Sequence, residues 1–258
     1  MSASSSIGRT IFQGIFIIIA VMLAFGANTF LTEQAQKKAE MESLELVLRD
    51  LGDSVDELKE FSTYSAGAFD AALVAYGELS GRAPYDKNAV RTALLRVDRN
   101  TLQLPMAAYK DMLYSGDLTV VRNRNLRDSI GRFYETVEHR LSVIENNNRV
   151  HIDGQLIPAL FERGLILPHF AGDTGQDATN MANGAINSQL GAGFSHRRDP
   201  IWNFPVDSRE WRTLRSTLLA AAQSYAISEN FANDMISEAQ RLEDAIVIYL
   251  NERSSYYY

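Results

Sequence analysis

An apolar stretch near the start of the chain is the strongest hydrophobic signal. No residue from Ile11 to Leu31 is charged, and its polar members Gln13 and Asn28 lie near the two ends. About 20 apolar residues, at ~1.5 Å rise per residue, cross a hydrocarbon core of ~30 Å. The pattern predicts a transmembrane helix over residues 11–31, after a short tail of residues 1–10. The side chains expected to form this anchor are Ile11, Phe12, Ile15, Phe16, Ile18, Leu23, Phe25, Asn28 and Phe30.

A cleavable signal peptide is the main alternative, because Arg9 precedes the apolar run and Ala24-Phe25-Gly26 resembles a cleavage site. The run is longer than a typical apolar signal core, and no turn signal follows it, which favours an uncleaved anchor. A buried core helix is disfavoured at a chain terminus. Since Arg9 on one side faces Lys37 and Lys38 on the other, positive charge barely sets the orientation. We expect the N-terminus in the cytoplasm and the body in the periplasm.

Helical periodicity continues after the anchor. Apolar residues recur alternately every three and four positions, which is the 3.5-residue period of coiled-coil packing. No proline precedes Pro84, so the anchor should continue outward as a stalk that ends at Ser80-Gly81-Arg82-Ala83-Pro84. The residues of this seam are Met41, Leu44, Leu48, Leu51, Val55 and Leu58.

Shorter helices are predicted next. One spans residues 86–100 with Asp86 as its N-cap, and another has Pro105 in its first turn and ends at Gly116, after which Asp117 starts a new turn. A third helix, capped by Asn123 or Asn125, should end in the asparagine cluster of residues 146–148, before a short helix over 156–163. Its apolar stripe comprises Leu126, Ile130, Phe133, Val137, Leu141 and Ile144.

The stretch from Leu165 to Val206 has no clear period and is rich in glycine and asparagine. Such a long irregular segment is unusual inside a compact domain and indicates a functional loop, a docking arm or disorder. We expect a docking arm, packed back by Ile201, Trp202 and Phe204, although its basic residues also fit a solvated loop. The residues expected to contact a partner are His196, Arg197, Arg198, Trp202, Phe204, Tyr256, Tyr257 and Tyr258.

The last helix has the clearest pattern, beginning after Asp207 or Ser208 and reaching about Arg253. Two long heptad seams are natural antiparallel partners, so this helix should return along the stalk toward the membrane. The tyrosine tail then ends near the headgroups, or it is simply frayed. The seam comprises Leu214, Leu218, Ala221, Tyr225, Ser228, Ala232, Met235, Ala239, Leu242, Ile246 and Tyr249.

These elements predict an all-α protein: a transmembrane helix continuing into a bundle with long antiparallel N- and C-terminal helices and an irregular Gly/Asn-rich arm. The expected divisions are residues 1–10 (tail), 11–31 (anchor), 32–164 (stalk and bundle), 165–206 (arm), and 207–258 (return helix and aromatic tail).

Composition narrows the function. A net charge of −7 argues against binding nucleic acid, which needs a basic footprint. The absence of cysteine excludes thiolate catalysis and Cys-ligated metals. The four histidines show no ligand spacing, and no phosphate-binding loop or nucleophile elbow occurs. We therefore expect no catalytic residue, no cofactor and no metal, and we identify no small-molecule substrate.

Two stretches resemble a group of uncharacterised bacterial single-span membrane proteins, the DUF6090-like proteins. Their anchor ends in a pattern matched by Ala24, Asn28 and Phe30, although Thr29 and Phe30 stand where the group has a second Asn and a Trp. Leu48-Arg49-Asp50-Leu51 also matches, and the turn Tyr114-Ser115-Gly116-Asp117-Leu118 resembles a Ser-Gly-x-Leu turn of the group. The resemblance implies an anchor with a helical domain in the bacterial inner membrane, and no known activity.

The leading functional hypothesis is a non-enzymatic, single-pass accessory or scaffold subunit whose partners are the lipid bilayer and other membrane protein subunits, for example of a respiratory or photosynthetic assembly. The alternative is a membrane-anchored sensor that binds a ligand between helices. The short segment before the anchor argues against this alternative. An enzyme would need carboxylates converging in a cleft, which the sequence does not reveal.

Overall fold

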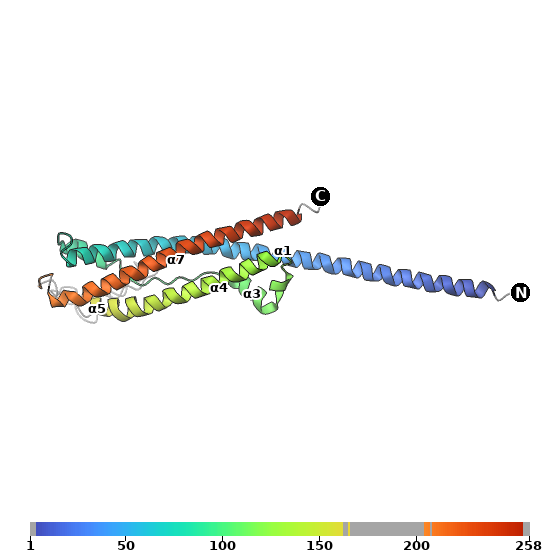
Figure 1. Ribbon diagram of the computed structural model, residues 1–258, viewed down its shortest axis with the longest axis horizontal. Coiled ribbons are helices and arrows are strands. Elements are labelled where there is room, and N and C mark those ends of the chain that lie inside the picture. Colours follow the sequence, from blue (N-terminus) through green and yellow to red (C-terminus); the bar gives the residue numbers. More distant parts are fainter. Residues whose placement is uncertain (1–3, 162–164, 166–203, 207, 255–258) are drawn as a thin grey trace, which may run out of the picture. The chain divides into compact units, whose positions relative to one another are not determined.

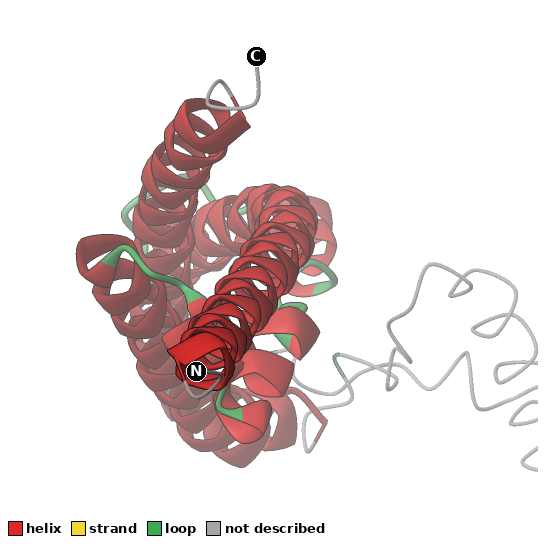
Figure 2. Cartoon of the chain, turned by 90° about the vertical axis from the view of Figure 1, so that its right-hand side faces the viewer, coloured by secondary structure: helices red, strands yellow, loops and turns green. Residues whose placement is uncertain are grey.

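The computed structural model describes residues 4–161, 165, 204–206 and 208–254, and for residues 4–20, 117, 161 and 254 it describes the backbone alone. This part of the chain is all-α and contains no strand (Figures 1 and 2). η1 is a 3-10 turn and η2 is a π-helix. The helices are α1 (Ser4–Leu79), α2 (Lys87–Leu94), α3 (Ala107–Ser115), η1 (Asp117–Val120), α4 (Arg124–Asn147), η2 (Asn148–Leu156), α5 (Ile157–Phe161) and α7 (Arg209–Ser254).

The chain folds into two compact units, each made of segments distant in sequence. Unit 1 comprises Met1–Asp50, Met106–Gly131 and Glu243–Tyr258, and unit 2 comprises Leu51–Pro105 and Arg132–Leu242. Helices α1, α4 and α7 each contribute residues to both units.

In unit 1, a side chain of α1 caps another helix. The carboxylate of Asp50 accepts a hydrogen bond from the backbone N–H of Ala108 at 2.8 Å, in the first turn of α3. α3 has no cap from its own N-cap residue, Met106, so Asp50 satisfies a donor that would otherwise lack a helical partner. The core of unit 1 includes Leu44, Val47, Tyr109, Met112, Val121, Leu126, Ile130, Ile246 and Tyr249.

In unit 2, α1 and α7 lie antiparallel. Ser62 of α1 donates to Asn233 of α7 at 2.8 Å, and Arg215 of α7 donates to the carbonyl oxygen of Leu79 of α1 at 3.1 Å. The second contact lies later in α1 and earlier in α7 than the first, so the two helices run in opposite directions. Small residues of α1, such as Ala72 and Ala75, allow close packing in the core, which α2, η2 and α5 complete. The largest fully buried side chains of this core are Leu79, Leu94, Ile152, Leu156, Leu160, Trp211, Leu214 and Leu218.

The end of α1 follows from one glycine. Gly81 has φ +71°, a left-handed conformation that costs least without a Cβ atom. The N–H of Arg82 donates to the carbonyl of Gly77 at 2.9 Å and that of Gly81 to Glu78 at 3.3 Å, which is the Schellman pattern. The predicted end of the stalk is therefore confirmed. Gly116, with φ +81°, ends α3 as predicted.

The predicted seam of α7 is confirmed: all eleven of its positions are buried. The seam of α1 is confirmed in period and corrected in register, because Met41 and Leu48 are only half-buried. Val47 and Ser54 occupy the positions that the sequence assigned to Leu48 and Val55, although Val55 is also buried. The buried heptad of α1 comprises Leu44, Val47, Leu51, Ser54, Leu58, Phe61, Ser65, Ala68, Ala72, Ala75 and Leu79.

The shorter helices differ from prediction at their ends. Asp86 caps α2, accepting from Asn88 and Ala89, but the helix ends at Leu94 instead of Asn100. Pro105 lies before the N-cap of α3 instead of in its first turn. Asn123 is the residue that caps α4, since its side chain accepts from the N–H of Leu126.

α4 ends at Asn147, inside the predicted asparagine cluster, but the helical path of the backbone does not stop there. The chain continues without a break from Asn147 into the π-helix η2 and then into α5. Asn148 is buried, and its side-chain amide donates to the carbonyl oxygen of Asn100 at 2.9 Å. A polar residue that usually favours a helix end is here retained inside the helix by that contact.

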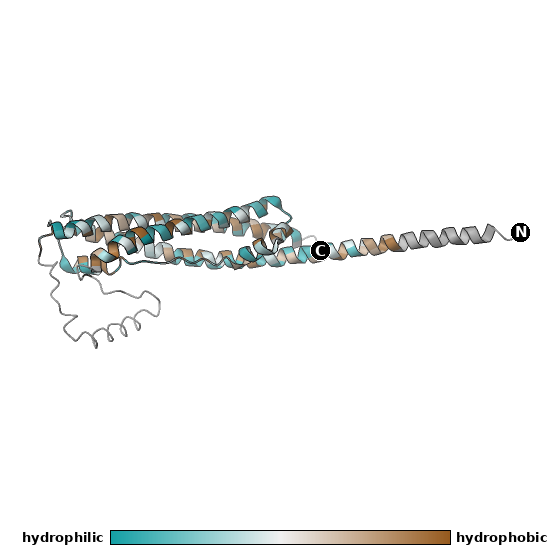
Figure 3. Cartoon of the chain, turned by 90° about the horizontal axis from the view of Figure 1, so that it is seen from below, coloured by the Kyte–Doolittle hydropathy of each residue, from teal (hydrophilic) through white to brown (hydrophobic). Residues whose placement is uncertain are grey.

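The hydropathy of α1 changes along its length, with apolar residues at the first side chains described and mixed residues beyond (Figure 3). Among helical segments whose side chains are described, none reaches the length and hydropathy needed to span a membrane.

The packing of α7 leads to a paired test. Leu218 is fully buried and its neighbour Leu219 is 49% exposed. We expect Leu218→Ala to lower the free energy of unfolding by about 2–5 kcal/mol, because it leaves a cavity. Leu219→Ala should stay within about 0.5 kcal/mol of the parent chain. Urea unfolding of the full chain in detergent, followed by circular dichroism, measures both; equal losses would contradict the burial of this seam.

Candidate functional site

The first side chains described in α1 are apolar and exposed on every side of the helix. All residues from Val21 to Glu33 are exposed, including Leu23 and Phe25 at 69% each and Leu31 at 66%. A helix of a water-soluble core normally buries one apolar stripe and exposes a polar face. We call residues 21–31 the apolar collar; nothing in the described chain covers it.

Two threonine hydroxyls, one in the collar and one directly after it, donate hydrogen bonds to carbonyl oxygens of their own helix. Thr29 donates to the carbonyl oxygen of Phe25 at 2.9 Å, and Thr32 donates to that of Asn28 at 2.8 Å. Such bonds to the preceding turn let a hydroxyl group sit in an apolar medium without water. The hydroxyls of Thr29 and Thr32 are therefore compatible with apolar surroundings.

The predicted anchor residues divide into two groups. Leu23, Phe25, Asn28 and Phe30 belong to the collar and are exposed. For the earlier members the helical backbone is present in α1, but their side chains lie outside the described residues. These are Ile11, Phe12, Ile15, Phe16 and Ile18.

Unit 1 contains a buried carboxylate, only 2% exposed, close after the collar. One oxygen of Glu40 accepts from the Tyr249 hydroxyl and from the backbone N–H of Arg122, each at 2.7 Å. The guanidinium of Arg253 lies 3.7 Å from the other oxygen and stacks on the Tyr249 ring. Burial, and then the bond to Glu40, raises the pKa of Tyr249. Glu40 thus joins α1, the entry to α4 and the end of α7.

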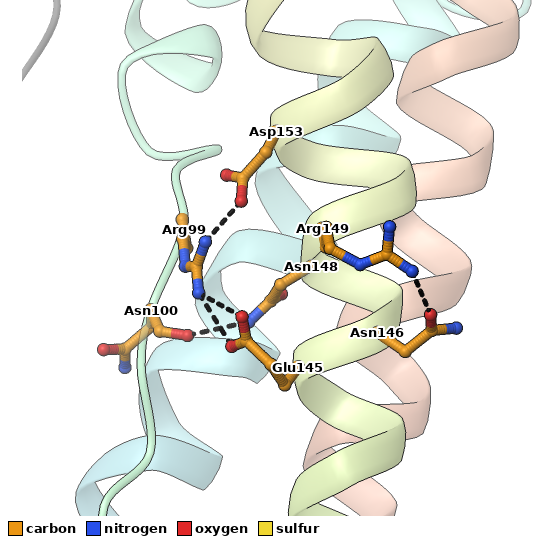
Figure 4. Close-up of polar contacts among 7 residues, drawn as sticks. All are labelled: Arg99, Asn100, Glu145, Asn146, Asn148, Arg149 and Asp153. Carbon is orange, nitrogen blue, oxygen red and sulfur yellow. Dashed lines mark hydrogen bonds and ion pairs between the residues drawn. The ribbon is translucent and has the colours of Figure 1, made fainter.

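Unit 2 contains a second polar cluster, centred on Arg99 (Figure 4). One nitrogen of Arg99 donates to both oxygens of Glu145 at 2.7 Å, and another donates to Asp153. The bond to Glu145 raises the pKa of Arg99, and the charge of Asp153 adds to this effect. The contacts tie the extended segment after α2 to α4 and to the π-helix.

The same extended segment is bound from its other side. The hydroxyls of Tyr64 in α1 and Tyr225 in α7 both donate to the carbonyl oxygen of Asp98 at 2.9 Å. Burial raises the pKa of Tyr64 to about 12 and raises the pKa of Tyr225 as well. Two phenols from different helices therefore bind one backbone oxygen.

The polar groups of these clusters already form hydrogen bonds and ion pairs with one another. Arg99 already serves two carboxylates, and Glu40 already has an arginine and two hydrogen-bond donors. Within the described residues, no group of three or more His, Asp or Glu side chains is placed to hold a metal ion. The arrangement can fix segments against each other, and we derive no reaction from it.

The predicted partner residues lie mostly outside the described part of the chain. Phe204 is described: its ring is 44% exposed, and its carbonyl oxygen accepts from the Trp211 indole N–H at 3.3 Å. The contact with the core of unit 2 is made by Val206 and Trp211 instead of the Phe204 ring. The residues outside the described part are His196, Arg197, Arg198, Trp202, Tyr256, Tyr257 and Tyr258.

The sequence analysis did not identify the structural roles of Glu40, Asp50 and Arg99. Glu40 lies four residues before Leu44 in the register of the buried heptad, whereas the predicted seam placed Met41 there. No local pattern marks Arg99.

Comparison with protein families, with curated proteins and with solved structures yields no match to this chain. The resemblance to the DUF6090-like proteins therefore stays a prediction from short motifs.

The Arg99 cluster can be tested against a neighbouring arginine. Arg99→Gln removes the cation between Glu145 and Asp153, and we expect the free energy of unfolding to fall by about 1–2 kcal/mol, the range for partly exposed charged hydrogen bonds. Arg149 bonds only to exposed Asn146 in Figure 4, so Arg149→Gln should cost less than about 0.5 kcal/mol. Urea unfolding measures both variants, and a similar loss of unfolding free energy in the two would contradict a special role for Arg99.

The phenol of Tyr64 predicts a pH dependence. Its pKa rises from 10.0 to about 12 on folding, so its stabilisation is complete below pH 10 and is lost as the pH rises through 12. The Tm of the parent chain should fall more steeply than that of Tyr64→Phe across this interval. Thermal unfolding at intervals of pH in both proteins measures the difference; parallel curves would show that Tyr64 is not buried as described.

Proposed function

We propose that this protein is a non-enzymatic, single-pass membrane-anchored accessory or scaffold subunit that binds and stabilises a larger membrane protein complex. The observation that carries the proposal is the apolar collar of α1, which is exposed on all sides. Large exposed apolar surfaces mark sites that contact membranes or other proteins. A collar that is apolar all round fits lipid better than a single protein groove, which would cover one face.

The sequence before the collar supports a bilayer as its surroundings. Apolar residues continue back to Ile11 without a charge, and α1 is one unbroken helix from Ser4 to Leu79. Every backbone N–H and C=O group inside hydrocarbon needs a partner, which a continuous helix provides. Residues 11–31 together have the length of one span.

The role of an accessory subunit is supported by how the polar groups are used. The buried Glu40 of unit 1 and the half-buried Arg99 of unit 2 hold the protein's own segments together. An anchored body built to keep its shape is suited to support neighbouring subunits. Contacts with those partners would then come from exposed surfaces and from the 165–206 arm.

A membrane-anchored sensor is a second candidate, favoured by the π-helix η2 of residues 148–156. π-helical segments are rare and occur frequently at functional sites. His151 lies in this segment, and its Nδ1 atom is buried without a hydrogen-bond partner among the described residues. A ligand that stabilises the full chain and shifts the His151 resonance would favour the sensor over the accessory subunit.

The anchor can be tested with a charge at the middle of the span. Val21 lies midway between residues 11 and 31, and an aspartate there opposes insertion by about 2.5–3.5 kcal/mol. We expect Val21→Asp to move a large part of the chain from the membrane pellet to the alkaline carbonate wash. Thr32→Asp, at the end of the span, should stay in the pellet. Release of the unmodified chain by carbonate would contradict the proposed membrane anchor.

The accessory role needs a separate measurement. After gentle detergent extraction of native membranes, the tagged chain should migrate on a native gel with a complex much larger than itself and co-purify with defined subunits. Loss of the chain should lower the thermal stability of that complex. Migration as an isolated chain, with the anchor intact, would leave the protein anchored but would reject the accessory role.

A further inference from the structure

The collar carries one polar side chain that its own helix does not bind. The amide of Asn28 is exposed and forms no hydrogen bond with any described residue. The hydroxyls of Thr29 and Thr32, by contrast, donate to carbonyl oxygens of the preceding turn. An amide can donate two hydrogen bonds and accept two, and leaving these unmade in apolar surroundings is costly. The Asn28 amide is therefore open to a partner outside the chain.

Asn28 belongs to a row of exposed residues that has the period of a coiled coil. The row comprises Val21, Ala24, Asn28, Leu31 and Ala35, with spacings of 3, 4, 3 and 4, and all five are exposed. We call this row the outer seam. In heptad notation Val21 and Asn28 take position a, and Leu31 takes position d. A β-branched residue at a with leucine at d favours two parallel strands, and a single asparagine at a specifies their register and number.

The outer seam has a defined end on the side of the bundle. Its next positions would be Lys38 and Glu42, which are exposed and lie 3.6 Å apart within the same helix. A second parallel copy would bring equal charges together there, so the apolar pairing stops after Ala35. In the other direction the spacing continues in the sequence to Ile17 and Gly14, whose side chains lie outside the described residues.

The outer seam lies on the opposite side of α1 from the core of unit 1. The buried heptad of α1 begins at Leu44, sixteen positions after Asn28. Sixteen residues turn a helix through about 160° beyond four full turns. A second helix can therefore lie on the outer seam without displacing any buried side chain of unit 1.

We propose that the outer seam pairs two copies of this chain, as parallel α1 helices whose Asn28 amides hydrogen-bond to each other. The occupant is a second copy because an amide is both donor and acceptor, so two of them are complementary. Two chains anchored in one membrane in the same orientation have Asn28 at the same depth, as a two-fold axis requires. The alanines of the seam allow close approach of the two helices.

This inference rests on the proposed membrane anchor and adds a second copy to it. Only one side of the collar is covered by the pairing, so the remaining sides stay in contact with lipid.

The absence of cysteine in the chain makes a cross-linking experiment direct. Ala35→Cys places a thiol on the outer seam, and Glu33→Cys places one on the far side of α1, two residues away; both positions are exposed. A disulfide needs Cα atoms within about 7 Å, which only the facing sides of a helix pair provide. In phosphatidylcholine vesicles at a high ratio of lipid to protein, we expect oxidation to link Ala35→Cys chains severalfold more than Glu33→Cys chains.

Two further variants, each in the Ala35→Cys chain, test the amide. Asn28→Leu keeps a side chain of similar size without the hydrogen-bonding groups, and it should lower cross-linking severalfold. Thr29→Val removes a hydroxyl that already bonds within the helix, so cross-linking should not change. Circular dichroism checks that all variants remain folded.

Three results would overturn the inference. Equal cross-linking at the two cysteine positions would indicate chance encounters. Cross-linking that Asn28→Leu leaves unchanged would show that water or lipid headgroups satisfy the amide. A link from Ala35→Cys to a different protein in native membranes, without the homodimer, would assign the seam to another subunit. If the chain stays in the carbonate-washed pellet in any of these cases, the anchor stands and the pairing alone fails.

Discussion

The architecture depends on one constraint: two long helices must each keep an apolar face of period 3.5 residues. On α7 eleven successive heptad positions from Leu214 to Tyr249 are buried, and on α1 the buried heptad extends from Leu44 to Leu79. Without that constraint, helices of this length would have little reason to remain ordered, since most helical stability in proteins comes from packing an amphipathic face. The shorter helices α2, α3 and α5 add their apolar sides to surfaces that these seams define.

A heptad seam alone does not determine which residues face each other. Where both helices present alanine, a slip of one helix by seven residues keeps the same period and a similar apolar contact. The polar contacts remove this freedom. Two phenols meet at the carbonyl of Asp98, and the fork of Arg99 needs Glu145 and Asp153 at fixed positions. Slipped arrangements would leave these groups partly buried without partners, which is costly. The polar clusters therefore act on register, and the seams supply most of the stabilisation.

Much of the fold could be predicted from the sequence, because it depends on patterns of residues close together in the chain. The α7 seam, the caps Asp86 and Asn123, and the glycine ends of α1 and α3 each depend on residues a few positions apart. The predicted register of α1 was wrong because Leu48 and Val55 have larger apolar side chains than their neighbours Val47 and Ser54, yet Ser54 is small enough for a close-packed position. Periodicity identifies a face to within one residue, and packing decides the rest.

The polar clusters could not be predicted, for the opposite reason. Glu40 finds Tyr249, and Asp50 finds the first turn of α3, across long separations that no spacing rule covers. Asparagine usually favours the end of a helix, and only the distant carbonyl oxygen of Asn100 explains why the helical path continues through Asn148. The membrane anchor is a proposal from composition, with which the exposed collar is compatible.

The continuity of α1 links these observations. α1 has no break between the collar and Glu40, so the core of unit 1 and the collar share one continuous helix. Glu40 is where Arg122 and Tyr249 attach to that helix, so both are carried at fixed heights above Leu31. The buried carboxylate thereby fixes Arg122 and Tyr249 at set positions along α1.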